Sequence, residues 1–166
     1  MTADDPVTVP ADTPLRALDD EPRTVGQWTT TFHLALVVLD PYTYESSWII
    51  DTAVRILRNF AEADCRTAFL VAADDEGAKR FLGPFVHEFL VFCDPDRLAI
   101  KAMGIERLPA FVHLNQANVI EGKAEGWKPD QWRAVADNLA RVMSWQRPTI
   151  PVSSDPVPFD GTPALG

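Results

Sequence analysis

Three short apolar segments, separated by stretches of helical periodicity, constrain the fold of this chain more than any other feature. Residues 33–39, 66–72 and 88–93 are nearly continuous apolar runs. Such runs are typical of strands that are buried on both faces of a sheet. Residues 45–63 and 76–82 place their apolar side chains at helical spacing instead. The sequence therefore predicts strands that are connected through helices.

The second half of the chain predicts a short helix, a hairpin and a final helix. Asp-Pro-Asp at residues 94–96 is expected to begin the short helix, with Pro95 at its first helical position. Residues 110–114 and 118–122 fit two strands of an antiparallel hairpin, and Pro129 opens the last helix. Strands that are joined through helices run parallel. The expected class is therefore α/β, with a mixed central sheet, a terminal antiparallel hairpin and flanking helices.

Acidic residues and prolines gather at the two ends of the chain. Residues 1–22 hold four prolines and six acids against one arginine, and residues 148–166 hold five prolines and two acids. Segments of this composition bury too little apolar surface to offset the entropy of ordering. We therefore expect a domain over residues 23–147 and a mobile tail over 148–166. Residues 1–22 are expected to be partly disordered, with an edge strand and turn docked at 15–20.

Overall composition excludes several classes of protein. A net charge of -9 repels phosphate, so binding to nucleic acid or to an anionic membrane is not expected. Two cysteines are too few for a disulfide framework or a four-ligand zinc site. The first residues are acidic without an apolar export segment, and the longest strongly apolar run, residues 34–39, is too short to cross a bilayer. These features predict a cytoplasmic protein.

A longer motif narrows the α/β class. Residues 92–112, which contain Cys-Asp-Pro-Asp, Gly-Ile and Leu-Pro, resemble the second half of a thioredoxin-fold redoxin. In that family the Asp-Pro-Asp turn begins a short helix, and a proline in a cis peptide precedes the hairpin. Pro109 matches that proline, and Gly126 matches the glycine before the last helix. Residues 74–93 resemble the helix-strand insertion of TlpA-type redoxins and peroxiredoxins. The resemblance implies a thioredoxin-like sandwich.

The chain departs from this family at the redox motif. Redox-active members carry Cys-x-x-Cys where the first buried strand meets the long helix. The residues that stand in its place are Tyr44, Glu45, Ser46 and Ser47. Without sulfur there, dithiol–disulfide exchange cannot run by the family mechanism. The peroxiredoxin pattern Pro-x-x-x-Thr-x-x-Cys also fails after Pro41, because Trp48 occupies the cysteine position.

Simple structural roles explain the polar residues of this segment. Ser46 and Ser47 have no base nearby in the sequence, so N-capping is a better interpretation than nucleophilic catalysis. Glu45 fits the first turn of a helix, where the helix dipole favours an acid. His33, His87 and His113 have no second histidine or cysteine at metal-ligand spacing. We therefore expect neither a metal site nor a cofactor.

The two cysteines are expected to lie apart. Cys65 precedes the second predicted strand and Cys93 ends the third, so parallel strands separate them by roughly 15–20 Å at about 3.3 Å per residue. No intramolecular disulfide is expected at that separation. Cys93 lies just before a predicted helix, whose dipole would lower the pKa of the thiol. A thiol reductase or peroxidase that uses this single cysteine is therefore the alternative function.

The first hypothesis is a redox-inactive thioredoxin-like protein that acts by binding, as a chaperone or adaptor does. The resemblance implies a cis-proline groove whose backbone accepts an extended segment of a partner protein. One side of this groove consists of Arg107, Leu108 and Pro109, and the other of Tyr42, Tyr44 and Trp48. The proline-rich tail is a candidate second contact. The sequence leaves the oligomeric state open.

Overall fold

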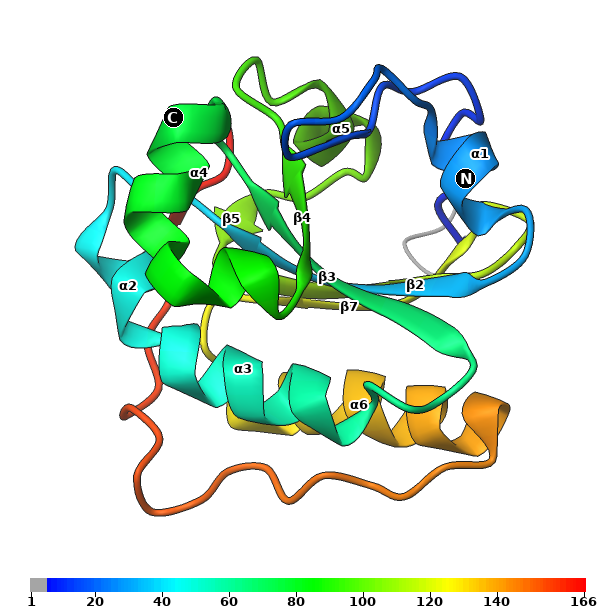
Figure 1. Ribbon diagram of the computed structural model, residues 1–166. Helices are drawn as coiled ribbons and strands as arrows, with labels where there is room; N and C mark the ends of the chain where they lie inside the picture. Colours follow the sequence, from blue (N-terminus) through cyan, green and yellow to red (C-terminus); the bar gives the residue numbers. More distant parts are fainter. Residues whose placement is uncertain (1–5) are drawn as a thin grey trace.

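A six-stranded mixed sheet forms the centre of the computed structural model, which describes residues 6–166 (Figure 1). The strand order is β1-β4-β3-β2-β6-β7. β2, β3 and β4 run parallel, whereas β1, β6 and β7 pair antiparallel to their neighbours. The strands are β1 (Arg16–Ala17), β2 (His33–Leu39), β3 (Cys65–Val71), β4 (Leu90–Cys93), β6 (Ala110–Leu114) and β7 (Ile120–Glu125). The expected α/β class with a mixed sheet and a terminal hairpin is confirmed.

Helices cover both faces of the sheet (Figure 1). Alternate strand residues such as Val37 and Phe69 pack with the buried faces of α3, α4 and α6, while Leu36 and Leu70 pack with those of α1 and α5. This alternation follows from the period of two in a strand, and it explains why the central strands are apolar throughout. The helices are α1 (Val25–Thr29), α2 (Tyr44–Trp48), α3 (Ile50–Asn59), α4 (Asp75–Leu82), the 3-10 turn η1 (Gly83–His87), α5 (Leu98–Ala102) and α6 (Pro129–Met143).

The helix expected over residues 45–63 is divided at Ile49. The Ser47 hydroxyl donates a hydrogen bond of 2.6 Å to the Tyr44 carbonyl, and the Ile49 N–H bonds the Ser47 carbonyl. These local bonds tighten the end of α2, and the buried Ile49 then links it to α3. The long apolar face belongs to α3, which ends at Asn59, so both the start and the end of the expected helix differ.

The Asp-Pro-Asp turn does not begin a helix at Pro95. Arg97 takes a left-handed backbone conformation, with φ of 58°, and α5 begins only at Leu98. The buried Asp94 carboxylate accepts a hydrogen bond of 2.9 Å from the Ile100 N–H. Asp94, four residues before α5, thus provides an acceptor for a backbone N–H in the first turn of this helix. This is the structural role of the Asp-Pro-Asp turn.

The N-terminal segment crosses the sheet from the start of β7 at one edge to β4, beside which it adds β1 as the other edge strand. The expected edge strand is confirmed, because β1 pairs antiparallel with β4. Val9 and Leu15 of this segment are buried, and Thr8 forms an isolated antiparallel bridge with Val119, just before β7. Partial disorder was expected over residues 1–22, and residues 1–5 of this range lie outside the described residues.

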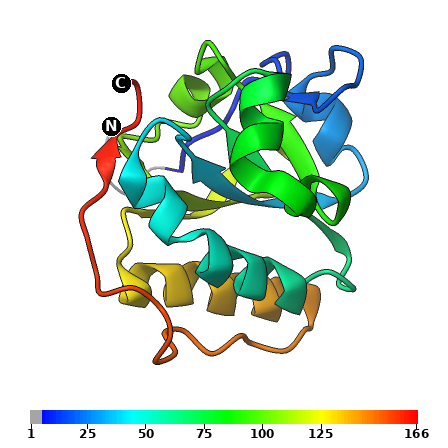
Figure 2. The ribbon, with the colours of Figure 1, turned by 60° about the vertical axis from the view of Figure 1, so that its left-hand side comes forward.

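The C-terminal segment differs from the mobile tail that its composition predicts. It runs beneath α3 and α6 and returns to the opposite end of the molecule (Figure 2). There β8 (Thr162–Pro163) pairs antiparallel with β5 (Arg107–Leu108) in a second, two-stranded sheet. Ile150 and Ala164 are buried, and the Trp127 indole N–H donates a hydrogen bond to the Pro156 carbonyl at 2.7 Å. A few anchors, spaced between prolines, dock the tail on the domain.

Candidate functional site

The residues at the expected redox position form α2, directly after the carboxyl end of β2. Ser46 is wholly buried, and its hydroxyl oxygen accepts a hydrogen bond of 2.9 Å from the Asp40 N–H. Thr43 precedes the helix, and α2 has no side-chain cap. The predicted N-capping role of the two serines is therefore wrong: Ser46 fastens the loop to β2, and Ser47 bonds back to Tyr44.

Three aromatic side chains around this loop face solvent, and we call them the aromatic patch. The exposed fraction is 72% for Tyr42, 81% for Tyr44 and 53% for Trp48. A hollow of about 410 Å³ adjoins Tyr42 and is also lined by Arg80 and Phe81 of α4. Large exposed aromatics beside a hollow are typical of interaction surfaces.

The other side of the predicted groove is covered by the chain itself. The Leu108–Pro109 peptide bond is cis, and Leu108 is wholly buried in the strand that pairs with β8. The Arg107 guanidinium donates to the Asp160 carbonyl at 2.9 Å, and the Ala164 N–H donates to the Glu106 carbonyl at 2.9 Å. The groove was expected to offer a free backbone, but β8 already occupies that edge.

A glycine makes this close contact possible. The backbone of Gly161 has φ of 82°, and a Cβ atom added there would lie 2.3 Å from the Leu108 carbonyl oxygen. Gly126 plays the complementary part, because a Cβ atom there would lie 2.5 Å from the Asp160 carbonyl oxygen. Any larger side chain at either position would force the tail away from β5. The two sides of the groove also meet through the tail, since Trp48 packs edge-to-face on Phe159 at 5.4 Å.

A buried ion pair links the tail to the loop after β2. The Arg97 guanidinium donates to the Asp40 carboxylate at 2.8 Å and to the Ala164 carbonyl at 2.6 Å. The Asp40 side chain is 4% exposed and that of Arg97 is 19% exposed. The second Asp40 carboxylate oxygen accepts from the Tyr42 N–H at 2.9 Å. Asp40 is therefore fully engaged in holding the loop.

Cys93 lies in a setting that opposes a reactive thiolate. Burial, followed by a hydrogen bond to the Asp75 carboxylate, raises the pKa of the Cys93 thiol to about 12. α5 begins five residues later, so the lowered pKa expected from its dipole is not found. Asp75 in turn forms an ion pair with Arg16, which holds the pKa of that carboxyl at about 2.

The two cysteines are free and lie at opposite ends of the sheet. Cys65 pairs with His33 at the start of β2, whereas Cys93 pairs with Val71 at the other end of β3. Burial raises the pKa of the Cys65 thiol to about 11. The predicted separation of the two thiols is confirmed.

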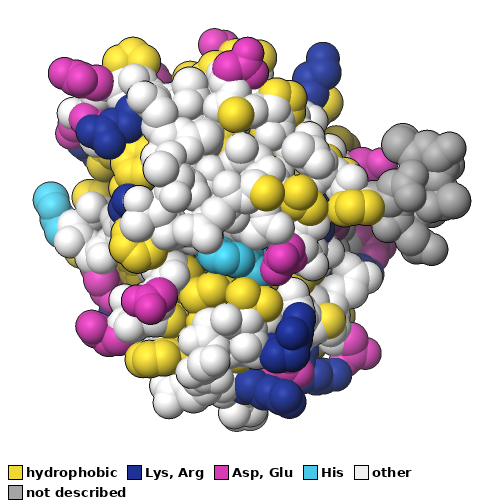
Figure 3. Space-filling view, turned by 90° about the vertical axis from the view of Figure 1, so that its right-hand side faces the viewer, with side chains coloured by type: hydrophobic (Ala, Val, Ile, Leu, Met, Phe, Trp, Pro, Cys, Tyr) yellow, Lys and Arg dark blue, Asp and Glu magenta, His cyan; other side chains and the backbone are white. Residues whose placement is uncertain are grey.

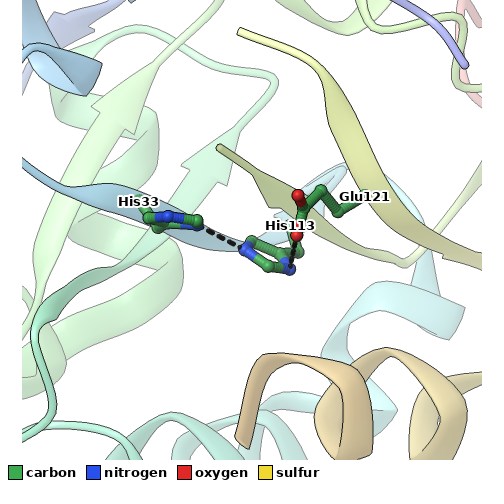
Figure 4. Close-up of side chains that lie close together, drawn as sticks. All are labelled: His33, His113 and Glu121. Carbon is green, nitrogen blue, oxygen red and sulfur yellow. Dashed lines mark hydrogen bonds and ion pairs between the residues drawn. The ribbon is translucent and has the colours of Figure 1, made fainter. Parts of the chain in front are cut away.

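A group of side chains at the amino end of β2 is not indicated by any pattern in the sequence. His33, His113 and Glu121 approach one another there (Figure 4), although 80 residues separate the two histidines in the sequence. The histidines are not at metal-ligand spacing in the sequence, but β2 and β6 are neighbours in the sheet and bring two of them together. The thioredoxin-like strand order, applied to the predicted strands, would have placed the two strands side by side, although it does not give their register.

Comparison with known proteins identifies the fold. No protein-family model and no curated protein matches the chain. A solved structure from Chlorobium tepidum, described as a DsbE thiol:disulfide interchange protein, is 14% identical with a TM-score of 0.67, covering 86% of this chain and 99% of that one. The fold is thioredoxin-like.

Two other solved structures support this assignment. A cysteine mutant of PrxQ from Xylella fastidiosa is 13% identical with a TM-score of 0.65, over 86% of this chain and 99% of that one. A hypothetical protein from Sinorhizobium meliloti is 13% identical with a TM-score of 0.64, over 99% of this chain and 96% of that one. The structural similarity establishes the shared thioredoxin-like fold, and at sequence identities this low it establishes the fold alone. Among the described residues, no helix combines the length and apolarity needed to cross a bilayer.

Proposed function

We propose that this chain is a redox-inactive thioredoxin-like protein that acts by binding another protein at the aromatic patch and the adjoining cis-proline groove. The observation that carries the proposal is the aromatic patch itself, which stands where the fold family places its redox motif. Tyr44 and Trp48 are largely exposed there, and the tetrad Tyr44–Ser47 contains no sulfur. A surface that has lost its thiol chemistry but retains exposed aromatics is suited to recognition.

The docked tail supports the groove as a site for extended segments. β8 pairs with β5 through main-chain hydrogen bonds, with Gly161 at the point of closest approach and Phe159 against Trp48. This is strand addition, performed by the chain on itself. A partner that presents an extended segment with a small residue and an aromatic would compete with the tail for β5.

Affinity capture tests the proposal. Wild-type protein and the variant Tyr44→Ala/Trp48→Ala would be used as baits. Leu98→Ala is the matched control, because Leu98 is 50% exposed on α5 and lines a different hollow from that beside Tyr42. We expect the partner to be lost from the double variant and retained by the control. Equal recovery with all three baits would contradict the proposal.

A thiol-dependent activity through Cys93 is the alternative. The names of the structural neighbours, a thiol:disulfide interchange protein and PrxQ, favour it, and a hollow of about 190 Å³ adjoins Cys93 and Arg16. The raised pKa of the thiol opposes it. The reaction of the native protein with hydrogen peroxide, compared with that of a Cys93→Ser variant, distinguishes this activity from the binding function. Rapid oxidation that depends on Cys93 would favour the enzyme.

A further inference from the structure

The amino end of β2 brings together three side chains from three strands. Ala35 of β2 lies directly opposite His113 of β6, so His33, two residues earlier, occupies the same face diagonally from His113. The His33 Nδ1 and His113 Nε2 atoms are 2.8 Å apart. Figure 4 shows Glu121 of β7 on the other side of the His113 ring. The three residues lie at the end of β2 away from the aromatic patch.

A bulge aims the carboxylate at the histidines. The β6–β7 register shifts between His113, which faces Gly122, and Leu114, which faces Ile120. Glu121 is the extra residue in this irregularity, and a bulge of this kind redirects a side chain. The Glu121 Oε2 atom thereby lies 3.8 Å from the His113 Nδ1 atom.

A neighbouring amide holds the carboxylate in this orientation. The Asn115 side-chain N–H donates to the Glu121 Oε1 atom at 3.1 Å. The side-chain amide oxygen of Asn115 is itself fixed, because it accepts from the Ala117 N–H at 2.8 Å and the Val119 N–H at 3.1 Å. One carboxylate oxygen is therefore anchored and the other is directed to His113. Metal-binding carboxylates are commonly supported in this way.

The His113 ring carries an unused polar atom. Its side chain is wholly buried, and Nδ1 has no hydrogen-bond partner. Burial lowers the pKa of His113 to about 4, so the ring is neutral at neutral pH and forms no ion pair with Glu121. Leaving a buried ring nitrogen unbonded is costly. A neutral imidazole beside a carboxylate is, however, a favourable pair of ligands for a metal ion.

We propose that His33, His113 and Glu121 form a binding site for a divalent transition-metal ion of the zinc class. One donor atom from each side chain lies within 4.8 Å of the other two. A histidine binds one ion through one ring nitrogen, and for His113 that donor is the unpartnered Nδ1 atom, which faces Glu121. The His33 Nδ1 atom contacts the other ring nitrogen of His113, so the half-buried His33 side chain would turn to reach the ion. Two imidazoles disfavour Mg²⁺ and Ca²⁺, which prefer oxygen ligands.

The site is open to solvent on one side. Glu121 is exposed and His33 is half-buried, and Figure 3 shows a histidine beside an acidic side chain at the surface of this face. Three protein ligands leave the fourth position of a zinc ion for water or another small ligand. The bound ion would join β2, β6 and β7.

Zinc titration tests this site directly. Tag-free full-length protein would be treated with a chelator, dialysed and titrated with ZnCl2 by calorimetry, with MgCl2 as the control ion. We expect one zinc ion per chain, no response to magnesium and a higher unfolding temperature with zinc. In the NMR spectrum, the ring signals of His33 and His113 should move on zinc addition while those of His87 stay. Absence of saturable zinc binding would overturn the proposal.

Single substitutions locate the ligands. His33→Ala and Glu121→Gln are expected to weaken zinc binding by about tenfold or more. His87→Ala is the matched control, because His87 lies in η1, outside the cluster, and its zinc affinity should equal that of wild type. Circular dichroism verifies that each variant is folded. If His33→Ala fails to fold, the zinc affinity of Glu121→Gln and the NMR shifts of the wild-type histidines decide whether the site exists. Unchanged affinity in folded Glu121→Gln, or an equal loss in His87→Ala, would exclude the site.

Discussion

At the carboxyl end of β2 the buried polar side chains are paired within the chain, whereas at its amino end one of them is not. Asp40 bonds Arg97 and the Tyr42 N–H, and Ser46 bonds the backbone of Asp40. At the other end, the Nδ1 atom of the buried His113 has no partner. Thioredoxin-fold enzymes are expected to hold their chemistry at the carboxyl end. In this chain the Asp40 and Ser46 side chains at that end are engaged within the chain, whereas the unpaired ring nitrogen of His113 lies at the amino end.

The largest expected effect comes from breaking the pairing at the carboxyl end. Arg97→Ala leaves the Asp40 carboxylate buried without its cation, and it also removes the bond to the Ala164 carbonyl. We expect a loss of about 3 kcal/mol in the free energy of unfolding, measured by urea denaturation. Arg58→Ala is the control, because the Arg58–Glu88 pair is exposed. Equal losses in the two variants would show that burial adds nothing to the Asp40–Arg97 pair.

The docked tail at this end is tested at Gly161. Gly161→Ala places a Cβ atom against the Leu108 carbonyl, whereas the control Gly83→Ala also has a positive φ but places its Cβ atom with nothing within 4 Å. The control is expected to cost about 1 kcal/mol through strain alone. Gly161→Ala should cost about twice as much and release β8, seen as faster hydrogen exchange at the Ala164 N–H. Similar exchange at that N–H in wild type and Gly161→Ala would contradict tight docking.

The strands and the main helices were predictable from the sequence because their signals are local. β2 is buried on both faces and therefore reads as an unbroken apolar run, and α6 carries a regular apolar stripe after Pro129. α1 was not foreseen, because its five residues give no periodicity. Its capping box, with Thr24 and Gln27, was present as a short signal.

The docked tail and the histidine cluster were not predictable from local patterns. The tail is attached by isolated anchors such as Ile150, Phe159 and Gly161, and prolines between them remove any periodicity. Its average composition resembles that of a mobile segment even though single residues fit the domain. His33 and His113 meet only through the β2–β6 register, which no sequence pattern specifies. Both features depend on contacts between residues that lie far apart in the sequence.

The two buried thiols, one at each end of the sheet, predict a loss of stability in alkali. The pKa values of Cys65 and Cys93 are raised in the folded protein to about 11 and about 12. Unfolded thiols release their protons near pH 8.5. Stability is therefore fully present below that pH and falls as the pH rises toward the folded values.

This loss can be measured as a difference between variants. Between pH 9 and pH 10 we expect each thiol to remove about 1 kcal/mol from the free energy of unfolding. Urea midpoints of wild type and Cys65→Ala/Cys93→Ala, compared across this range, cancel the other groups that titrate there. Parallel pH curves for the two proteins would mean that folding does not raise the pKa values of the two thiols.

The smallest expected effect on stability is at the aromatic patch. Tyr44 is 81% exposed, so Tyr44→Ala should change the free energy of unfolding by less than about 0.5 kcal/mol. Trp48→Ala should cost slightly more, because it removes the edge-to-face contact with Phe159. Thermal denaturation measures both. Small changes in stability together with loss of partner capture would mean that these aromatics are retained for recognition, whereas a large loss of stability for Tyr44→Ala would assign the patch a role in holding α2 in place.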